Sequence, residues 1–292
     1  LNPAEKIGEG TTELDRAYAN MSGAVALVPM PQKSRSFEAR AWATVRELDN
    51  MTALAYVSLI NSVPKINIAD WQGVEEGFEQ GLTLATQLGD NRTAGFCISG
   101  LAHMTYYQGY FRRSLALFKQ LEALGEAAQD VTHWGTALGA IGAVLMRWGQ
   151  WPEAMAYLDK GLPLTRAAGN SLAEWNTLVR IGLAQFHLNQ LDKAQQSVEA
   201  AYAYATQAPH SSFANTTIYS DLITLLLHLQ EQAPTAAPDA PGKIKKLLKR
   251  YKQYARIFPF ALPTYWRLRG RADWLNGRSS AQFRRHSRIN RP

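Results

Sequence analysis

The sequence is poor in cysteine and has no long apolar run. Cys97 is the only cysteine among 292 residues, so no disulfide can form within the chain and no cysteine cluster can bind a metal. This cysteine usage is typical of a reducing compartment, and we expect a cytoplasmic protein. The most apolar run, residues 131–146, contains His133 and three glycines and is followed by Arg147. A membrane-spanning helix needs about 20 apolar residues, so we expect a buried helix here and no membrane span.

Side chains in catalytic arrangements are also scarce. None of the six histidines forms the zinc-protease spacing; they are His103, His133, His187, His210, His228 and His286. Glu75, Glu76 and Glu79 could form a carboxylate pair, but Val74 and Phe78 occupy the opposite helical face, so we interpret the glutamates as a solvated surface. The sequence therefore predicts no catalytic residues, no cofactor site and no metal site, and we expect this chain not to be an enzyme.

A glycine-containing stretch near the start could be mistaken for a phosphate-binding loop. Residues 8–12 read Gly-Glu-Gly-Thr-Thr and precede a helical pattern, but they lack the lysine of such loops and no strand precedes them. Thr12 and Asp15 have instead the spacing of a variant capping box. We expect a helix start at this point rather than an anion site.

Acidic residues almost disappear from the last part of the chain. Residues 243–292 contain 15 Lys and Arg but only one acid, Asp273, whereas residues 1–242 contain 16 Lys and Arg against 23 acids. A basic segment can meet nucleic acid, anionic lipid or an acidic protein surface. No helix-turn-helix pattern is recognisable, and we do not expect direct binding of nucleic acid or of a membrane.

One short phrase recurs at a fixed interval and organises the chain. Its four copies begin at Ala69, Gly109, Gly149 and Asn189. In every copy a small or branched residue and then a large apolar residue follow on one helix face. These pairs are Val74 and Phe78, Ser114 and Phe118, Ala154 and Leu158, Ala194 and Val198. A second turn signal lies about midway between one copy and the next, so each unit reads as two helices and two turns. The period predicts an all-α, right-handed α-solenoid of six hairpins and a partial seventh.

The chain divides into three parts by composition. Residues 1–231 form the repeat array, and residues 232–242 are a Pro- and Ala-rich insertion that we expect to be extended and mobile. Residues 243–292 are a basic helical extension that completes the sixth hairpin and starts a truncated seventh. Burial of its aromatic residues should contribute more free energy than the attraction between this basic segment and the acidic array. We therefore expect residues 243–276 to pack on the sixth hairpin, and residues 279–292 to stay mobile. Within the second hairpin, Pro64 should end or kink the first helix.

The repeat resembles the tetratricopeptide repeat. The resemblance is carried by Leu178-x-x-Ile181-Gly182 followed by Asn189-x-Leu191-x-x-Ala194, and most closely by residues 149–154 followed by Leu158. The unit of ~40 residues is longer than the usual unit of ~34 residues, which favours a subgroup with longer helices.

The end of the array resembles one group of multidomain proteins more narrowly. Residues 256–259, Trp266, Gly270 and residues 274–278 are similar to the end of C-terminal repeat arrays in large bacterial signalling ATPases. Those proteins carry a P-loop ATPase module, with a class III nucleotide cyclase or a protein kinase domain upstream. The resemblance implies a non-catalytic interaction or sensory arm whose parent could be described as an ATP-binding cyclase or kinase. The array of a transcription regulator, sensing a ligand, is the second alternative.

The resemblance also implies where a partner binds. In this family the first helix of each hairpin lines the concave surface, and the partner is a protein or peptide, including another domain of the same polypeptide. The corresponding positions are Phe96, Ser99, His103, Tyr106, Tyr107, Met146, Arg147, Asn176, Phe186 and His187. The Lys and Asn residues of the chaperone-binding carboxylate clamp are absent, so we do not expect that binding mode.

Overall fold

The computed structural model describes residues 18–21, 31–48, 50–207, 210 and 212–277, and every regular element in that part of the chain is a helix. The elements are α3 (Pro31–Leu48), α4 (Met51–Asn67), α5 (Trp71–Leu88), α6 (Asn91–Tyr107), α7 (Phe111–Ala127), α8 (Val131–Arg147), α9 (Trp151–Ala167), α10 (Ser171–His187), α11 (Leu191–Gln207), α12 (Asn215–Gln232), α13 (Ala240–Ile257), the 3-10 turn η1 (Pro259–Ala261) and α14 (Leu262–Leu275). None of these helices is long and apolar enough to cross a bilayer.

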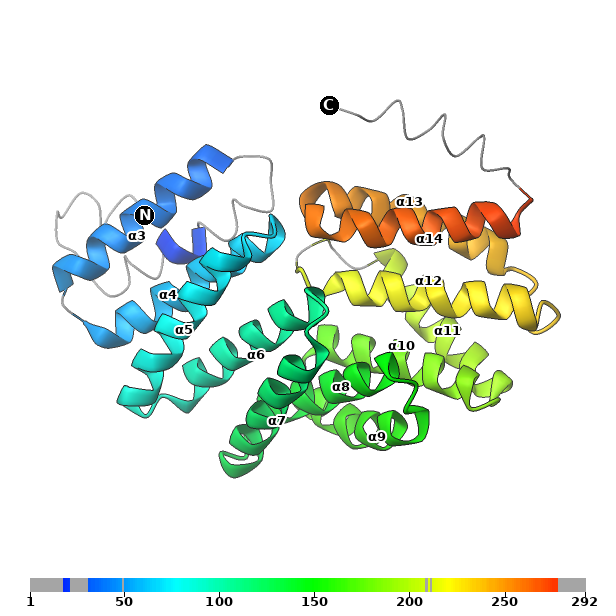
Figure 1. The fold of residues 1–292 in the computed structure, drawn as a ribbon, viewed down its shortest axis with the longest axis horizontal. Coiled ribbons are helices and arrows are strands. Elements are labelled where there is room, and N and C mark those ends of the chain that lie inside the picture. Colours follow the sequence, from blue (N-terminus) through cyan, green and yellow to red (C-terminus); the bar gives the residue numbers. More distant parts are fainter. Residues whose placement is uncertain (1–17, 22–30, 49, 208–209, 211, 278–292) are drawn as a thin grey trace.

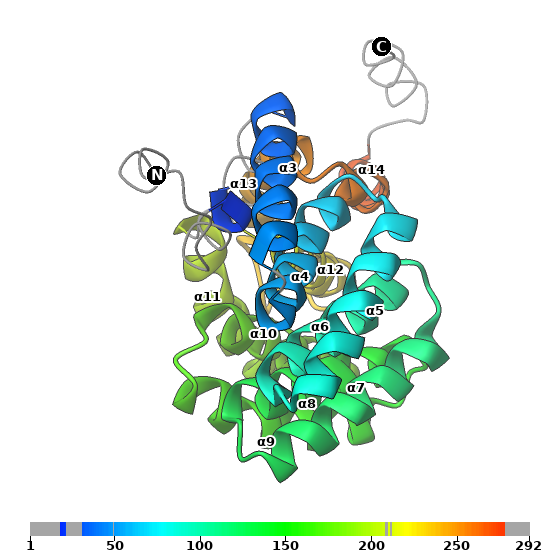
Figure 2. The same ribbon diagram turned by 90° about the vertical axis from the view of Figure 1, so that its left-hand side faces the viewer.

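Successive helices pair as antiparallel hairpins that stack into a curved array (Figures 1 and 2). We call α4, α6, α8, α10, α12 and α14 the first helices and α5, α7, α9, α11 and α13 the second helices. The helices from α6 to α11 are equal in length and begin at equal intervals along the sequence. The prediction of an all-α solenoid with a constant period is confirmed. The second helix of the first hairpin is α3, whereas its first helix and the capping box at Thr12 lie largely outside the described residues.

Each regular turn contains a residue with left-handed backbone geometry. Five are glycines, at 89, 109, 149, 169 and 277, and three are Ala69, Gln129 and Asn189, with φ between 53° and 85° for all eight. In the turn after α6, the amides of Gly109 and Tyr110 donate to the carbonyls of Tyr106 and Thr105 at 3.1 and 2.8 Å. These bonds satisfy carbonyls that the end of a helix leaves unpaired, so the repeated phrase acts as a helix stop.

The residues that follow each phrase form the core between paired helices. Val74, Phe78 and their counterparts in the next three units are at most 2% exposed. Glycines in the first helices permit this packing: a Cβ at Gly142 would lie 2.8 Å from Cδ2 of Leu158, and one at Gly182 would lie 2.7 Å from Cβ of Ser197. A larger residue would force the helices apart, which is the reason for the small residue at this position.

Pro64 does not end its helix. The chain stays helical beyond the proline as far as Asn67. Ile66 is fully buried and packs in the same cluster as Val74 and Phe78. Burial of a side chain of this size contributes about 1.5–3 kcal/mol, which offsets the hydrogen bond that the proline cannot donate.

The Pro- and Ala-rich segment between α12 and α13 is turned rather than extended. Residues 234–236 and 238–239 form turns, and α13 begins at Ala240 with Pro241 in its first turn instead of at Lys243. Ala233, Ala237 and Ala240 are 9%, 4% and 0% exposed. Alanine is small enough to pack tightly at the end of a hairpin. The Pro- and Ala-rich composition did not predict this buried position.

The basic helices α13 and α14 pack against α12 through apolar side chains. Tyr251, Tyr254, Phe258 and Tyr265 are each at most 2% exposed, and the rings of Tyr254 and Phe258 stack with centroids 4.5 Å apart. The positive charges of α13 lie mostly on its outward side, except Lys243, which pairs with Glu199 and Asp239. Residues 278–292 lie outside the described residues.

The turn geometry predicts opposite effects for two exchanges. Ala69→Gly should raise the free energy of unfolding by about 0.5–1 kcal/mol, since an L-residue in the left-handed region costs about 1–2 kcal/mol and glycine avoids it. Gly109→Ala should lower it by a similar amount, because a Cβ there meets nothing within 4 Å and only the backbone is strained. Urea unfolding of both variants measures the two changes. If both variants raised, or both lowered, the free energy of unfolding, the role of the left-handed turn would be contradicted.

Candidate functional site on the inner face

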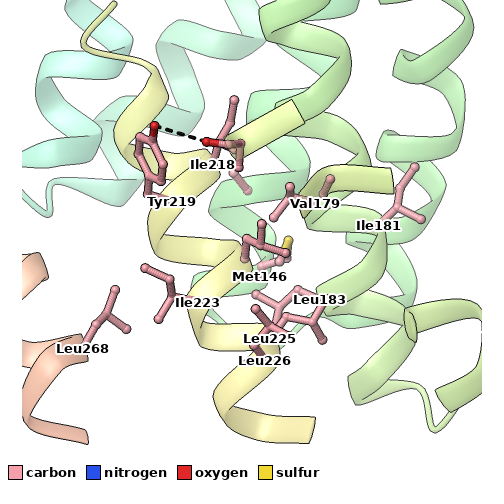
Figure 3. Close-up of a cluster of buried hydrophobic side chains, with 14 of the residues drawn as sticks. Met146, Val179, Ile181, Leu183, Ile218, Tyr219, Ile223, Leu225, Leu226 and Leu268 are labelled. Atoms are coloured by element: carbon pink, nitrogen blue, oxygen red, sulfur yellow. Dashed lines mark hydrogen bonds between the residues drawn. The ribbon is translucent and has the colours of Figure 1, made fainter. Parts of the chain in front are cut away.

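The first helices form the inner face of the array. Twelve residues of α8 are buried but only four of α9, and the same contrast separates α10, with nine, from α11, with four. Figure 1 shows α8, α10 and α12 inside and α7, α9 and α11 outside. The inner helices meet through apolar side chains such as Met146, Leu183 and Leu225, which Figure 3 shows together.

A small polar pocket opens on this inner face. Its volume is about 100 Å³, and it is lined by residues of α6, α8, α10 and the start of α12, among them His103, Thr136, Asn176, Arg180 and Thr217. The pocket has room for one side chain rather than for a whole ligand. Its polar lining lies inside an otherwise apolar core.

Two arginines share one buried carboxylate beside this pocket. Arg180 Nε lies 3.8 Å from Asp221 Oδ2, and Arg147 Nη2 lies 3.7 Å from Asp221 Oδ1. The side chains of Arg180 and Asp221 are each only 8% exposed, whereas Arg147 is 41% exposed. Arg147 Nε also donates to the hydroxyl oxygen of Tyr106 at 2.8 Å. The three charges sum to one excess positive charge on the inner face.

Arg180 is incompletely satisfied by the protein. Its Nη1 donates to the carbonyl of Gly139 at 3.1 Å, but its Nε is buried without a hydrogen-bond acceptor, because 3.8 Å to Asp221 is an ion-pair distance and too long for a hydrogen bond. A buried donor of this kind costs free energy until it is paired. Arg180 Nε therefore depends on the nearby carboxylate of Asp221, because the buried atom is closed to solvent.

The remaining pocket side chains are held by their neighbours. Thr217 Oγ1 donates to Asn176 Oδ1 at 2.5 Å, and Asn176 Nδ2 donates to the carbonyl of Leu172 at 3.1 Å. His103 Nδ1 lies 2.8 Å from the carbonyl of Ser99. Burial lowers the pKa of His103 to about 4, so this imidazole is neutral near pH 7.

Aromatic residues from the end of the chain close one side of the inner face. The ring of Phe260, in η1, lies 5.1 Å from that of Tyr107 in α6, and the ring of Phe213 lies 6.2 Å from Tyr107 and 5.9 Å from His103. Phe260 also meets Trp71 at the start of α5, with centroids 6.5 Å apart. The array thus curves until its sixth and seventh units touch its second and third, and Tyr107 is covered by the chain itself.

The structure distributes the ten predicted surface residues unevenly. His103 and Asn176 line the same pocket, and Tyr106 bonds to Arg147. Met146 and Phe186 are 8% and 7% exposed and belong to the core.

Three further predicted residues lie away from the pocket. Phe96 is 39% exposed and packs on His133 near the other end of α6 from Tyr106. Ser99 is partly buried one turn before His103. His187 is exposed and stacks on Trp151 at 3.8 Å.

Several other residues pack or pair within the array. Cys97 is fully buried, and burial raises the pKa of its thiol to about 12, so it carries no thiolate near pH 7. Glu75 and Glu79 pair with Arg113 of the next unit at 2.6 and 3.7 Å. Phe111 packs within its hairpin on Tyr106, 5.5 Å away. In the described part of the chain no three His, Cys, Asp or Glu side chains gather as metal ligands.

Arg180, Thr217 and Asp221 were missed by sequence reasoning. Asp221 is the only acid in the first half of α12, and Arg180 stands alone among apolar residues of α10. A lone acid and a lone base, each inside an apolar helix pattern, are expected to pair because an unpaired buried charge is costly. This signal was available in the sequence.

Comparison with known proteins agrees with the helical repeat. No family model matches the chain, and no curated protein matches it. Among solved structures, the apo form of RapI has a TM-score of 0.63 at 10% identity and covers 91% of this chain and 99% of its own. The apo quorum sensor NprR from B. thuringiensis has a TM-score of 0.53 at 16% identity, covering 84% of this chain and 70% of its own.

A third similar structure belongs to a much longer protein. The signal transduction ATPase with numerous domains from Pyrococcus horikoshii, which has a tetratricopeptide repeat sensor, has a TM-score of 0.51 at 14% identity. The match covers 88% of this chain but 39% of that one. At these identities the likeness concerns the fold, and the chain has the fold of tetratricopeptide-like repeat arrays.

The buried ion pair gives a stability test of the inner face. Asp221→Asn should lower the free energy of unfolding by about 3 kcal/mol, because it leaves Arg180 buried without a counter-charge. Glu174→Gln is the matched control: it removes the partner of Arg166 at 2.9 Å, where the side chains are 25% and 56% exposed, and should cost about 0–1 kcal/mol. Chemical denaturation measures both; equal small losses would show that Asp221 does not hold the inner helices.

Proposed function

We propose that this chain is a non-catalytic sensory or interaction array that binds a protein or peptide segment on its inner face. One observation carries the proposal: polar side chains from α6, α8, α10 and α12 converge on one pocket in an apolar core. A core needed only for folding gains little from gathering polar side chains at one place, since buried polar groups stabilise only when they are paired.

The size and charge of the pocket limit what it accepts. About 100 Å³ fits one side chain, so a segment would lie across α8 and α10 and insert a single residue. The Arg180 guanidinium and the second amide proton of Asn176 favour an inserted group that accepts hydrogen bonds, such as a carboxylate or an amide. The excess positive charge around Arg147 and Arg180 favours an acidic residue over a basic one.

The likeness to arrays with sensing roles supports the sensory part of the proposal. NprR is a quorum sensor, and the Pyrococcus ATPase carries its repeat as a sensor. We further propose that this chain is the regulatory arm of a multidomain signalling ATPase, acting in the cytoplasm. The end of the array, from Arg256 to Arg278, resembles the end of such arms.

Peptide selection tests the proposed site. A random peptide library displayed on phage and panned against the full chain should yield peptides with an acidic or amide residue at one fixed position. Ala173 lines the pocket and is partly buried, so Ala173→Trp should fill its mouth and weaken the selected peptides at least tenfold. Fluorescence anisotropy with labelled peptides measures the affinity.

The control is an alanine-to-tryptophan substitution at a position outside the pocket. Ala200 is exposed on the second helix α11, and Ala200→Trp should leave peptide affinity unchanged. Selected peptides that bind both variants equally, or no selected peptide at all, would contradict an inner-face site. Hydrolysis of ATP by the purified chain would contradict the non-catalytic part.

A further inference from the structure

A groove lies between α13 and α14, which pack side by side at the C-terminal end of the array (Figure 1). Its volume is about 620 Å³, and its apolar floor is formed by Ile244, Leu248, Tyr265 and Ala272. No residue of this groove lines the pocket on the inner face. The groove is therefore a second and separate surface.

The corresponding interface is closed in an earlier unit. Between α5 and α6, a Cβ at Gly81 would lie 2.9 Å from Sγ of Cys97, and Leu101 is 3% exposed. Arg269 holds the repeat position of Leu101 in α14, and its side chain is 31% exposed. A charged guanidinium is costly to bury, so α14 does not close on α13 as α6 closes on α5. The connection between α13 and α14 also contains η1, where only two or three turn residues join the earlier helices.

The dimensions of the groove match one extended peptide chain. Its lining residues on α13 run from Pro241 to Lys252, which is about 16 Å along a helix. A volume of about 620 Å³ over this length gives a cross-section of roughly 40 Å². An extended chain occupies roughly 48 Å², whereas a helix 10–12 Å across occupies roughly 80–110 Å². The groove thus has room for about five residues in an extended conformation.

Lysines line the whole α13 side of the groove. Lys245, Lys249 and Lys252 follow one another at spacings of four and three, so they form one stripe. None of the three has an ion-pair partner among the described residues. On the opposite side, Arg269 and Asp273 pair with each other at 2.7 Å. Because the lysines are spread along the groove, an occupant with one anionic group would leave two of them unpaired, and the charge favours acidic groups at intervals.

An extended peptide satisfies the floor and the lysine stripe together. Its successive side chains point to opposite faces, and those on one face are about 6.6 Å apart. The three lysines are about 6 and 4.5 Å apart along the helix axis, and their long flexible side chains reach acids at that interval. The apolar side chains between the acids would then face Ile244 and Leu248.

We propose that this groove binds an extended segment of a partner protein in which acidic and apolar side chains alternate. Single-stranded nucleic acid is also a polyanion, but its bases stack on aromatic side chains, and the ring in the floor, Tyr265, is only 2% exposed. The sequence after Gly277 contains five arginines and no acid, so it does not complement the lysines. The proposal adds a second binding surface to the function proposed above.

A fluorescein-labelled peptide tests the groove. The probe has about nine residues and alternates aspartate or glutamate with leucine or valine. The full chain should bind it with a micromolar Kd in about 50 mM NaCl, and at least fivefold more weakly in about 300 mM NaCl, as measured by fluorescence anisotropy. A block peptide of the same composition, with the acids together and the apolar residues together, should bind at least fivefold more weakly.

One variant fills the groove without changing its charge. Gly242 lines the groove, and a Cβ there meets nothing within 4 Å, so Gly242→Trp should place its indole in the groove and weaken binding at least tenfold. Gln253 is exposed on the same helix outside the groove, and Gln253→Trp should leave the affinity within about twofold. Circular dichroism checks that both variants keep the helical fold.

Charge reversals separate the lysine stripe from general attraction. Lys245→Glu with Lys249→Glu should weaken binding at least tenfold. Lys160→Glu with Lys193→Glu changes the same number of exposed charges on α9 and α11 and should leave the affinity within about twofold. Ala173→Trp, which fills the pocket on the inner face, should also leave it unchanged.

Three results would overturn the proposal. The first is no binding of the alternating peptide, or binding that neither Gly242→Trp nor the exchange of Lys245 and Lys249 weakens. The second is equal binding of the block peptide, because net charge alone would then explain the affinity. The third is a single-stranded oligonucleotide that binds at least tenfold more tightly than the peptide and is weakened by the same variants, because the occupant would then be a nucleic acid.

Discussion

A left-handed residue at every regular turn is the constraint on which the array depends. It ends each helix from α6 to α10 at the same length, so that equal helices follow one another at equal intervals. Equal helices joined by equal turns place Phe78, Phe118, Leu158 and Val198 at related heights in successive hairpins, where each is buried. The regular core then follows from the turns, because burial between neighbouring units stabilises the stack.

The equal helices and turns also produce the inner face and bring the C-terminal unit into contact with the second and third units. A small rotation at each unit brings η1 and the start of α12 back to α5 and α6, where Phe213 and Phe260 meet Tyr107 and Trp71. The polar pocket lies beside this closure and shares His103 with it. A segment that binds in the pocket would therefore contact helices whose arrangement the closure fixes.

The sequence was sufficient for the fold because the signals were local and repeated. The positions of Gly109 and Gly149, with the apolar residues after them, specified helix ends within one residue or two. The helix end expected at Pro64 did not occur, because burial of Ile66 outweighed the local preference of proline. The start of α13 was placed too late, because Pro241 fits the first turn of a helix.

The candidate site could be predicted only in part. The family resemblance placed His103, Asn176 and Arg147 on the inner helices. The lone charges of Arg180 and Asp221 suggest a buried pair, but their meeting also depends on how α10 faces α12. The approach of Phe260 to Tyr107 spans several units and depends on the accumulated curvature, which no local pattern encodes.

The closure of the array by its own C-terminal unit is the central claim, and a double-mutant cycle tests it most directly. Tyr107→Ala, Phe260→Ala and the double variant would be compared by urea unfolding. Ring centroids 5.1 Å apart predict a coupling free energy of about 0.5–1.5 kcal/mol between the two sites. Strictly additive losses would show that α6 and η1 do not meet in solution and would contradict the account.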